Sequence, residues 1–274
     1  MVAAGSVGVI MIKPAGQPVP ANSSPPVTPT SVTMQKTAAA AWVANQVNPA
    51  TTIACDQAMC AELRARGYPG GHLRQLSSQA ALKSSGIVVV TPAARQLFGS
   101  SLATAYAPVT LVKFGSGGSA VSVRLVAPHG ANVYLQAARQ DQAARASAEV
   151  VLTQAGTITM SAPAVRQLKN GRVDGRLAEA ITAAATAEPI NILDFGNVGT
   201  GASSIVPLRY ADLTVSTSAA GMSVQAYVQA LRAGMNSDTG ARPDRTQLVT
   251  LPGGQRVLRV EFLAPSPFGV LNSP

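Results

Sequence analysis

The sequence predicts a mixed α/β protein with two folded units: a small, Rossmann-like, mostly parallel α/β unit, then an α+β unit with a largely antiparallel sheet. The chain has 274 residues, which is more than one domain commonly contains. Helix and strand patterns alternate in its first half, and its second half ends with two strand patterns around a Pro-Gly-Gly turn. We therefore expect domains at 35–128 and 156–274, joined by a connecting helix at 129–155.

The composition indicates which residue types can form the core and which kinds of binding partner the net charge favours. Hydrophobic residues make up 47% of the chain and aromatic residues only 4%, so the core must be aliphatic. The net charge is +9, which favours anionic partners in general. The basic residues are scattered, and no run of Lys or Arg forms the footprint of a nucleic-acid interface. Binding of nucleic acid or another anionic polymer is therefore only a third functional hypothesis.

The first 34 residues predict a membrane-proximal segment and a stalk. The apolar run Val2–Ile12 is shorter than the roughly 20 residues that span a bilayer, and no basic residues precede it as they would in a signal peptide. Residues 14–33 are rich in Pro, Ser and Thr, a composition that does not fold. We interpret the run as the outer end of a truncated membrane span, with a disordered apolar start as the alternative. This layout predicts a membrane-anchored or secreted extracytoplasmic protein.

The two cysteines predict a disulfide at a strand–helix corner. Residues 51–55 form a strand pattern, and Asp56 is suited to cap a helix that runs to Arg66. Cys55 therefore ends the strand, and Cys60 lies about one turn into the helix. An oxidising compartment would join them, and two buried free thiols are the alternative. The pair predicts no metal site because a structural zinc needs four ligands, and we expect no cofactor.

The remaining elements of the first unit follow from periodicity and turn signals. The β-branched run 86–91 predicts a strand buried on both faces. Gly115–Ser119 predicts a hairpin turn rather than a phosphate-binding loop, since a strand follows it. His72 and His129 are isolated in the sequence and are not expected to be catalytic. Helices are expected at 35–47 and 92–98, and further strands at 110–114 and 120–127.

The second unit combines helices with strands of alternating polarity. Its helices are expected at 132–154, 161 onwards, 173–187 and 223–233, and its strands at 157–161, 190–195, 208–216, 246–251 and 256–263. The segment Asn197–Ser204, rich in Gly, Ser and Thr, is expected to be a loop beside two strand ends.

Residues 36–127 resemble the soluble extracytoplasmic modules of actinobacterial membrane proteins. The resemblance is carried by Ala41-Trp42-Val43, by Ile53-Ala54-Cys55-Asp56 and by Val88-Val89-Val90-Thr91-Pro92. These motifs are structural rather than chemical. The resemblance therefore implies location and fold, and it implies no activity.

The C-terminal half resembles the zinc D-Ala-D-Ala carboxypeptidases that trim peptidoglycan. Val173, Asp174, Arg176 and Leu177 match a motif at the head of a helix, and Ser203 and Asp212 match two positions further on. Ile205 stands where the zinc-binding His is expected, and the strand Leu258–Phe262 lacks the family's His-x-His. Because a catalytic zinc needs three protein ligands, the resemblance implies a related scaffold without its metal centre. The alternative is an unrelated α+β fold in which Asp212 is a solvated strand-end carboxylate.

The sequence thus favours a non-catalytic extracytoplasmic envelope protein that binds or scaffolds a cell-wall polymer or a protein partner. A cell-wall peptide hydrolase is the alternative. Asp194 and Asp212 could meet on adjacent strands, and whether they form a site stays open. The oligomeric state is not predicted. The candidate binding edge comprises Asn197, Ser203, Ser204, Arg209 and Asp212.

Overall fold

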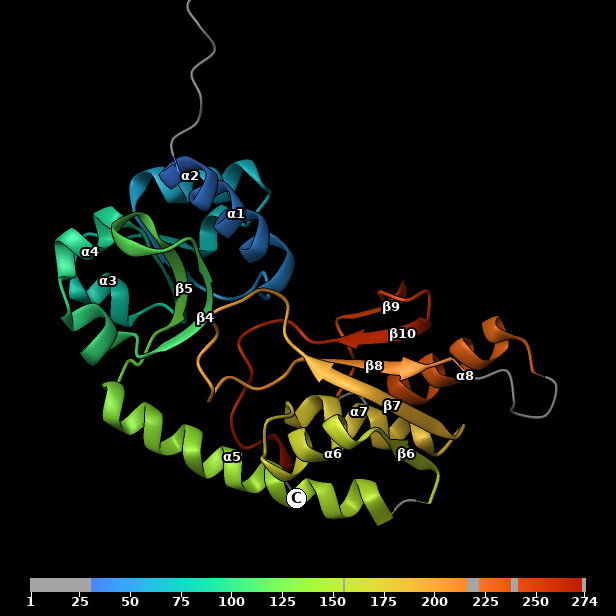
Figure 1. Cartoon of the computed structure of the whole chain (residues 1–274). Helices are drawn as coiled ribbons and strands as arrows, with labels where there is room; N and C mark the ends of the chain where they lie inside the picture. The colour runs from blue at the N-terminus through green and yellow to red at the C-terminus, as the bar shows by residue number, and fades with distance from the viewer. Residues whose placement is uncertain (1–30, 155, 216–221, 238–240, 273–274) are drawn as a thin grey trace, which may run out of the picture.

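The structure, a computed structural model, describes residues 31–272 except 155, 216–221 and 238–240. It confirms the mixed α/β fold, with a mostly parallel five-stranded sheet in the first unit and a mostly antiparallel five-stranded sheet in the second (Figure 1). The apolar run and most of the predicted stalk lie outside the described residues. The stalk was predicted to extend to residue 34, but helix α1 already begins at Ser31. Within the described ranges, no helix combines the length and hydrophobicity needed to cross a bilayer.

The first sheet has the strand order β2-β1-β3-β5-β4. Strand β1 is parallel to β2 and β3, whereas β5 is antiparallel to β3 and β4, as the hairpin at residues 115–119 requires. The short strand β2 was not predicted, because its sequence Leu-Arg-Gln has no strand periodicity. The strands are β1 Ile53–Cys55, β2 Leu73–Gln75, β3 Ile87–Val90, β4 Val109–Phe114 and β5 Val121–Leu125.

Helices cover both faces of this sheet. One core contains residues of α1 and α2 with Ile87 and Val89, and the other contains residues of α3 and α4 with Val88 and Val90. Strand β3 is therefore buried on both faces, as its β-branched run predicts. The helices and helical turns are α1 Ser31–Gln46, α2 Gln57–Ala65, η1 Gly70–His72, α3 Gln79–Lys83, α4 Pro92–Phe98, the π-helical turn η2 Leu102–Tyr106 and η3 Gly117–Ser119.

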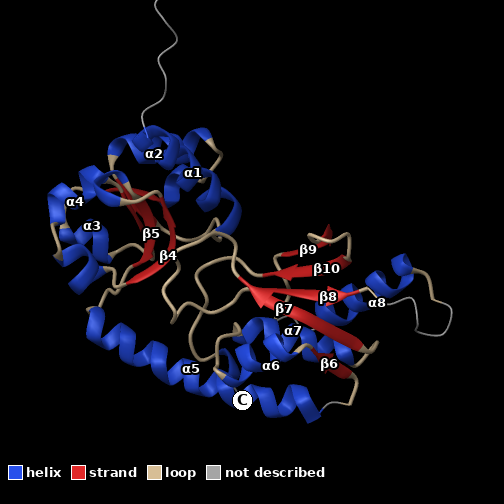
Figure 2. Ribbon diagram, viewed as in Figure 1, coloured by secondary structure: helices blue, strands red, loops and turns tan. Residues whose placement is uncertain are grey.

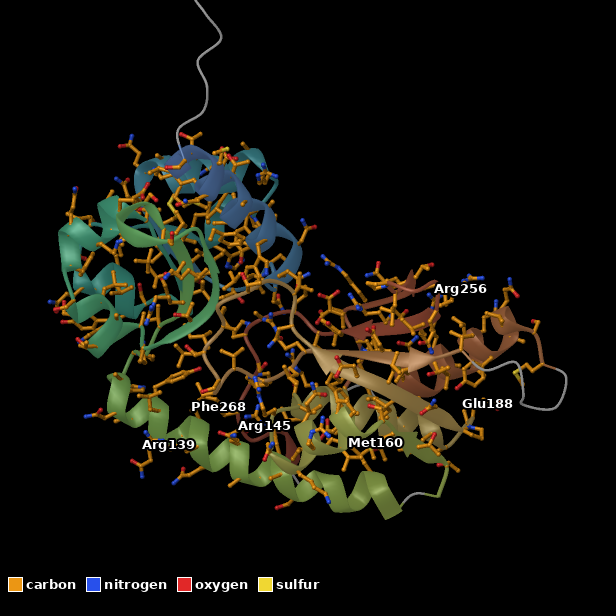
Figure 3. All side chains as sticks on the ribbon, viewed as in Figure 1. Arg139, Arg145, Met160, Glu188, Arg256 and Phe268 are labelled. Carbon is orange, nitrogen blue, oxygen red and sulfur yellow. A yellow bond between two sulfur atoms is a disulfide. The ribbon has the colours of Figure 1, made fainter. Side chains whose placement is uncertain are left out.

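Helix α5, Ala131–Gln154, runs along both units (Figure 1). It contacts η2 of the first unit and α6, α7 and β6 of the second. Its Tyr134 also packs against Phe268 of the C-terminal tail, with 5.2 Å between the ring centroids. Figure 3 labels Arg145, which belongs to this helix, and Phe268, which lies close to it.

The second sheet has the order β6-β7-β8-β10-β9, in which only β6 and β7 are parallel. The helices α6, α7 and α8 contribute to a single hydrophobic core with this sheet (Figure 2). The elements are β6 Ile158–Met160, α6 Ala162–Lys169, α7 Gly175–Ala185, β7 Ile190–Gly196, β8 Tyr210–Thr214, α8 Val224–Ser237, β9 Arg245–Thr250, β10 Arg256–Glu261 and η4 Val270–Asn272.

Helix α7 is shorter than the predicted range 173–187. Asp174 has an extended backbone and caps the helix by accepting a hydrogen bond from the Arg176 amide. Val173 instead forms a parallel bridge with Leu208. The helix therefore begins only where the cap ends, since the cap residue itself cannot be helical.

A segment of the second unit is fastened to the first. We call residues 197–207, which form most of the connection between β7 and β8, the strap. The amide of Lys113 donates to the Thr200 carbonyl (2.9 Å), and the Ser203 amide donates to the Thr110 carbonyl (2.8 Å). The Trp42 indole N–H donates to the Val198 carbonyl (2.8 Å). The strap thus covers β4, the edge strand of the first sheet, and ties the two units together.

Candidate functional site

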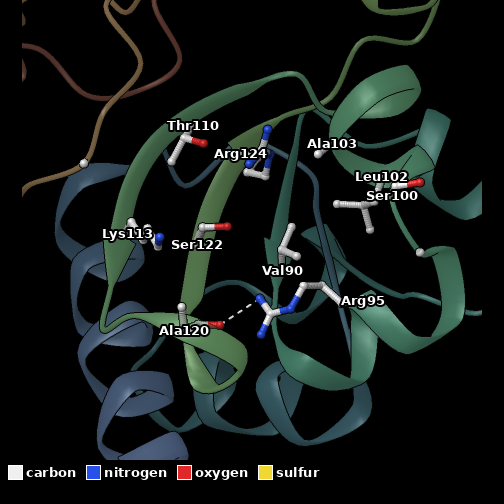
Figure 4. A pocket seen from close by; sticks show the side chains of 13 residues that line it. Val90, Arg95, Ser100, Leu102, Ala103, Thr110, Lys113, Ala120, Ser122 and Arg124 are labelled. Atoms are coloured by element: carbon white, nitrogen blue, oxygen red, sulfur yellow. Dashed lines mark hydrogen bonds between the residues drawn. The ribbon is translucent and has the colours of Figure 1, made fainter.

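A pocket of about 520 Å³ lies on the face of the first sheet that carries α4 (Figure 4). Its floor is formed by side chains of β3, β4 and β5, and its rim by α4, by the segment that leads into η2 and by Gly201 of the strap. A volume of this size suits a small-molecule ligand or a segment of a polymer.

Strand register brings the polar residues of this floor together. On β5, Val121, Val123 and Leu125 point into the core beneath α1. The alternate residues Ser122 and Arg124 therefore face the pocket, because successive strand side chains point to opposite faces. Ser122 pairs with Val90 of β3 on one side and with Lys113 of β4 on the other, and Arg124 pairs with Thr110. A register shift between Thr110 and Val112 allows both Thr110 and Lys113 to line the same pocket.

Arg95 of α4 reaches the pocket from its rim. Its Nη1 donates to the Ala120 carbonyl (2.8 Å; Figure 4), and its Nη2 donates to the Gly118 carbonyl (2.6 Å). Carbonyl oxygens are neutral, so these bonds fix the orientation of the guanidinium and leave its charge in place. The glycine turn between β4 and β5 therefore positions a cation rather than a phosphate.

Arg124 is held in the same way at the other side of the pocket. Its Nε donates to the Ala107 carbonyl (2.6 Å) and its Nη2 to the Pro108 carbonyl (3.0 Å). Burial lowers the pKa of Arg124, but a guanidinium stays protonated throughout the physiological range. The side chain is therefore a fixed, half-buried positive charge.

The positive charges of this pocket are not neutralised by the protein. No carboxylate is among the residues that line it. Within the described ranges, Arg95, Lys113 and Arg124 form no ion pair, and the Lys113 ammonium and the Ser122 hydroxyl have no hydrogen-bond partner. Ser122 is only 8% exposed. Unpaired donors and uncompensated positive charge make the pocket suited to an anion.

This site was not predicted from the sequence. Its residues come from α4, β4 and β5, and they meet only because of strand register, which one sequence does not reveal. A local signal does exist in Val121-Ser-Val-Arg-Leu125, where polar residues alternate with valines. That alternation indicates a strand with one polar face.

The disulfide predicted between Cys55 and Cys60 is present, so the alternative of two free thiols is wrong. Asp56 caps α2, as predicted, by accepting from the Met59 amide (2.9 Å). Its other oxygen accepts a short hydrogen bond from the Thr91 hydroxyl. The corner is thereby linked to Thr91, which itself caps α4.

The predicted binding edge is largely engaged in internal contacts. Ser203 Oγ accepts from the Thr110 amide (2.9 Å), and Asn197 Nδ2 donates to the Pro207 carbonyl (2.8 Å). Arg209 is 2% exposed and lies over the Trp42 ring, whereas Ser204 is exposed. Ligand binding by these residues stays a prediction, and the contribution of this loop to the pocket comes from Gly201.

Asp212 is not the solvated strand-end carboxylate of the alternative interpretation. It is 4% exposed, and both of its oxygens accept hydrogen bonds from Arg259, each at 2.8 Å. The Arg259 guanidinium also stacks on the Tyr210 ring at 4.1 Å. Asp194 does lie opposite Asp212 in the register of β7 and β8, but the Asp212 carboxylate is occupied by the arginine.

A second buried charge cluster lies where the two units meet. Arg176 donates to both oxygens of Asp174 (3.1 and 2.8 Å), and the Ser266 hydroxyl donates to one of them (2.6 Å). Burial raises the pKa of Asp174, but these hydrogen bonds and the charge of Arg176 outweigh burial and hold that pKa below its usual value. Burial also lowers the pKa of Arg209 to about 10, although the charge of Asp174 opposes the shift. Asp174 and Arg176 neutralise one another, whereas the Arg209 Nε donates to the Asn197 side-chain oxygen (3.2 Å) and its Nη1 is buried without a hydrogen-bond partner in the described residues.

None of the positions expected from the resemblance to zinc peptidases is among the residues that line the pocket, although Ser203 is hydrogen-bonded to Thr110 of its floor. Ile205, which stands in place of a zinc ligand, packs against the core of the first unit. Among the residues that the structure describes, no cluster of three or more His, Cys, Asp or Glu side chains could hold a metal ion. Comparison of the chain with models of protein families, with curated proteins and with solved structures gave no match.

Proposed function

We propose that this chain is a non-catalytic extracytoplasmic envelope protein that binds an anionic cell-wall or envelope component in the pocket of its first unit. The observation that carries the proposal is the convergence of Arg95, Lys113 and Arg124 on one pocket without a carboxylate partner in the described chain. A non-catalytic role fits a lining that contains no His, Cys, Asp or Glu to act as general base.

The physical argument is that the folded protein holds like charges together with nothing to offset their repulsion. Each guanidinium is fixed by backbone carbonyls, so little side-chain entropy is left to lose on binding. An anion that enters would gain charge-assisted hydrogen bonds of about 1.5–3 kcal/mol each. The site is therefore arranged to hold an anion by several bonds at once.

The disulfide supports the proposed location. Disulfides persist in oxidising environments such as the cell exterior and are rare in the reducing cytosol. Cys55 and Cys60 form one between β1 and α2. The same bond supports an envelope protein rather than a cytosolic binder of small anions.

Isothermal titration calorimetry with inorganic phosphate, citrate and poly(glycerol phosphate), and with neutral dextran as comparator, tests the proposal. At least one anion should bind with a saturable isotherm. The double variant Arg95→Gln/Lys113→Gln should bind that anion roughly 10- to 100-fold more weakly, because it loses one or two charge-assisted hydrogen bonds. Arg256→Gln is the matched control, since Arg256 is exposed on β10 and lies on the second unit, away from the pocket (Figure 3).

Three results would count against the proposal. Binding that is equally weak for every anion, or equally reduced by Arg256→Gln, would mean that net charge rather than the pocket attracts the ligand. Consumption of a bound probe, followed by phosphorus-31 magnetic resonance, would contradict a non-catalytic role. Release of stem peptides from peptidoglycan, with stoichiometric zinc in the protein, would favour a cell-wall peptide hydrolase instead.

A further inference from the structure

We propose that the group recognised in this pocket is a phosphate monoester, a dianion whose terminal oxygens are centred on the Ser122 hydroxyl. The inference rests on the anion-binding function proposed above and narrows it to one ligand chemistry. It distinguishes a terminal phosphate from the phosphodiesters and carboxylates that a cationic pocket would also attract.

The first step is the placement of the donors. Ser122 lies in the middle strand of the pocket floor, directly opposite Lys113 in the register of β4 and β5. Arg124 follows two residues later on the same face, about 7 Å along the strand. Figure 4 shows Lys113, Arg95 and Arg124 on three different sides of Ser122. The hydroxyl is thus surrounded by cations and has no protein acceptor within the described residues.

The second step is the balance of donors and acceptors. A guanidinium has five N–H groups, and each of the two arginines uses one nitrogen for each of two carbonyls. The remaining N–H groups, the Lys113 ammonium and the Ser122 hydroxyl are all donors. A ligand that satisfies them needs several acceptor oxygens on one centre, approached from several sides. A monoester phosphate offers three such oxygens, whereas a diester offers two and a carboxylate two in one plane.

The third step is charge. The lining contributes three positive charges and no negative one. A monoester dianion cancels two of them, whereas a diester or a carboxylate cancels only one and leaves more like-charge repulsion in a half-buried site. The dianion is therefore the anion that these three side chains favour.

The remaining space limits what the phosphate is attached to. The apolar part of the lining consists of Val90, Leu102, Ala103 and Ala120, and none of the residues around the pocket is aromatic. A nucleobase would find no ring on which to stack. The ester group is accordingly a small aliphatic or polyol moiety, either free or at the end of a polymer or lipid.

The pH dependence of binding gives a direct test. The titratable side chains that face the pocket are Arg95, Lys113 and Arg124, from α4, β4 and β5. None of these residue types titrates between pH 5 and 7.5 in the ordinary case, whereas a phosphate monoester loses its second proton near pH 6. The affinity for sn-glycerol 3-phosphate should therefore rise about tenfold from pH 5 to pH 7.5. Its diester analogue, glycerophosphoglycerol, should bind at least tenfold more weakly at pH 7.5 and show no such rise.

Variants identify the centre of the site. Ser122→Ala should reduce the affinity for sn-glycerol 3-phosphate about five- to tenfold, and Lys113→Met about tenfold or more, with unchanged circular dichroism spectra. Lys36→Met is the matched control for the lysine, because Lys36 lies on α1 at the opposite face of the sheet, and this variant should bind like the wild type.

Vesicles that contain phosphatidate, compared with vesicles of phosphatidylglycerol, show whether the monoester is on a lipid. Preference for phosphatidate, or for the soluble ester alone, would each support the inference.

Two failures can be told apart. If diester and monoester bind equally and neither affinity changes with pH, the monoester inference is wrong while the anion-binding pocket stands. If no anion binds, or if Ser122→Ala and Lys113→Met leave the affinity unchanged, the pocket is not the site and both proposals fall.

Discussion

At the scale of single residues, this protein holds buried charge in two different ways. Asp174 and Asp212 each accept hydrogen bonds on both carboxylate oxygens from one arginine, so their charges are neutralised. Arg95 and Arg124 donate only to backbone carbonyls, which orient the guanidinium without cancelling its charge. The first arrangement stabilises the fold, and the second leaves a positive charge available to an anionic ligand.

Asp174 makes the stability of the protein fall as the pH is lowered into the acid range. Because its pKa is lower in the folded protein than in the unfolded chain, its contribution is complete above about pH 4 and disappears as the pH falls through the folded value. Asp174→Asn should lower the free energy of unfolding by about 3 kcal/mol at pH 7, since Arg176 then loses its buried partner. Urea denaturation of both proteins from pH 7 downward should show this difference shrinking in acid.

The control for this experiment is Asp194→Asn, which removes the same charge from a half-buried carboxylate that forms no ion pair within the described residues. A difference for Asp174→Asn that stays constant with pH would mean that lost packing or capping, and not the ionised carboxylate, causes the destabilisation.

At the scale of helices and strands, the sequence predicted the elements that carry a local signal. The caps Asp56, Thr91, Ser161 and Ser223 each accept a hydrogen bond from the first turn of their helix. Helix α3 was missed although Ser78 caps it in the same way, because the helix has only five residues. The short strand β2 was missed because it exists only as a partner of β1, and that pairing is not local. The pocket was missed for the same reason: Lys113 and Ser122 become neighbours only through strand register.

The disulfide between β1 and α2 gives a prediction at this scale. Closing so short a loop should stabilise the protein by about 2 kcal/mol through the entropy of the unfolded chain. Reduction with dithiothreitol, or the double variant Cys55→Ala/Cys60→Ala, should lower the free energy of unfolding by that amount in guanidinium titrations. Thiol titration of the unreduced, denatured protein should find no free thiol, and a count of two would refute the bond.

At the scale of the whole molecule, the two units are joined by contacts at several places. The strap pairs with β4, the Asn48 amide donates to the Ala264 carbonyl (2.8 Å), and α5 contacts elements of both units. Lys113 and Thr110, which line the pocket, are the residues whose backbones the strap holds. The second unit therefore helps to position the pocket of the first.

Gly201 tests this coupling. Its φ is +74°, and a Cβ there would lie 2.9 Å from Lys113 Cβ. Gly253 also has a positive φ, +98°, but a Cβ there would meet nothing within 4 Å. Both Gly201→Ala and Gly253→Ala should cost about 1–2 kcal/mol of backbone strain, but only Gly201→Ala should weaken anion binding, by displacing Lys113. Equal affinities of the two variants in calorimetry would show that the strap does not position the pocket.

The position of the strap in the sequence also determines when, during synthesis, the edge of β4 becomes covered. Ser203, which covers the edge of β4 at Thr110, lies 93 residues further along the chain. At the usual speed of translation a ribosome needs roughly 5–20 s to add a stretch of that length. Throughout that interval the nascent first unit has β4 as an uncovered sheet edge, which is a template for pairing with other chains. During that interval the edge of β4 is open to pairing with other chains, and it is closed only when Ser203 and its neighbours have been synthesised.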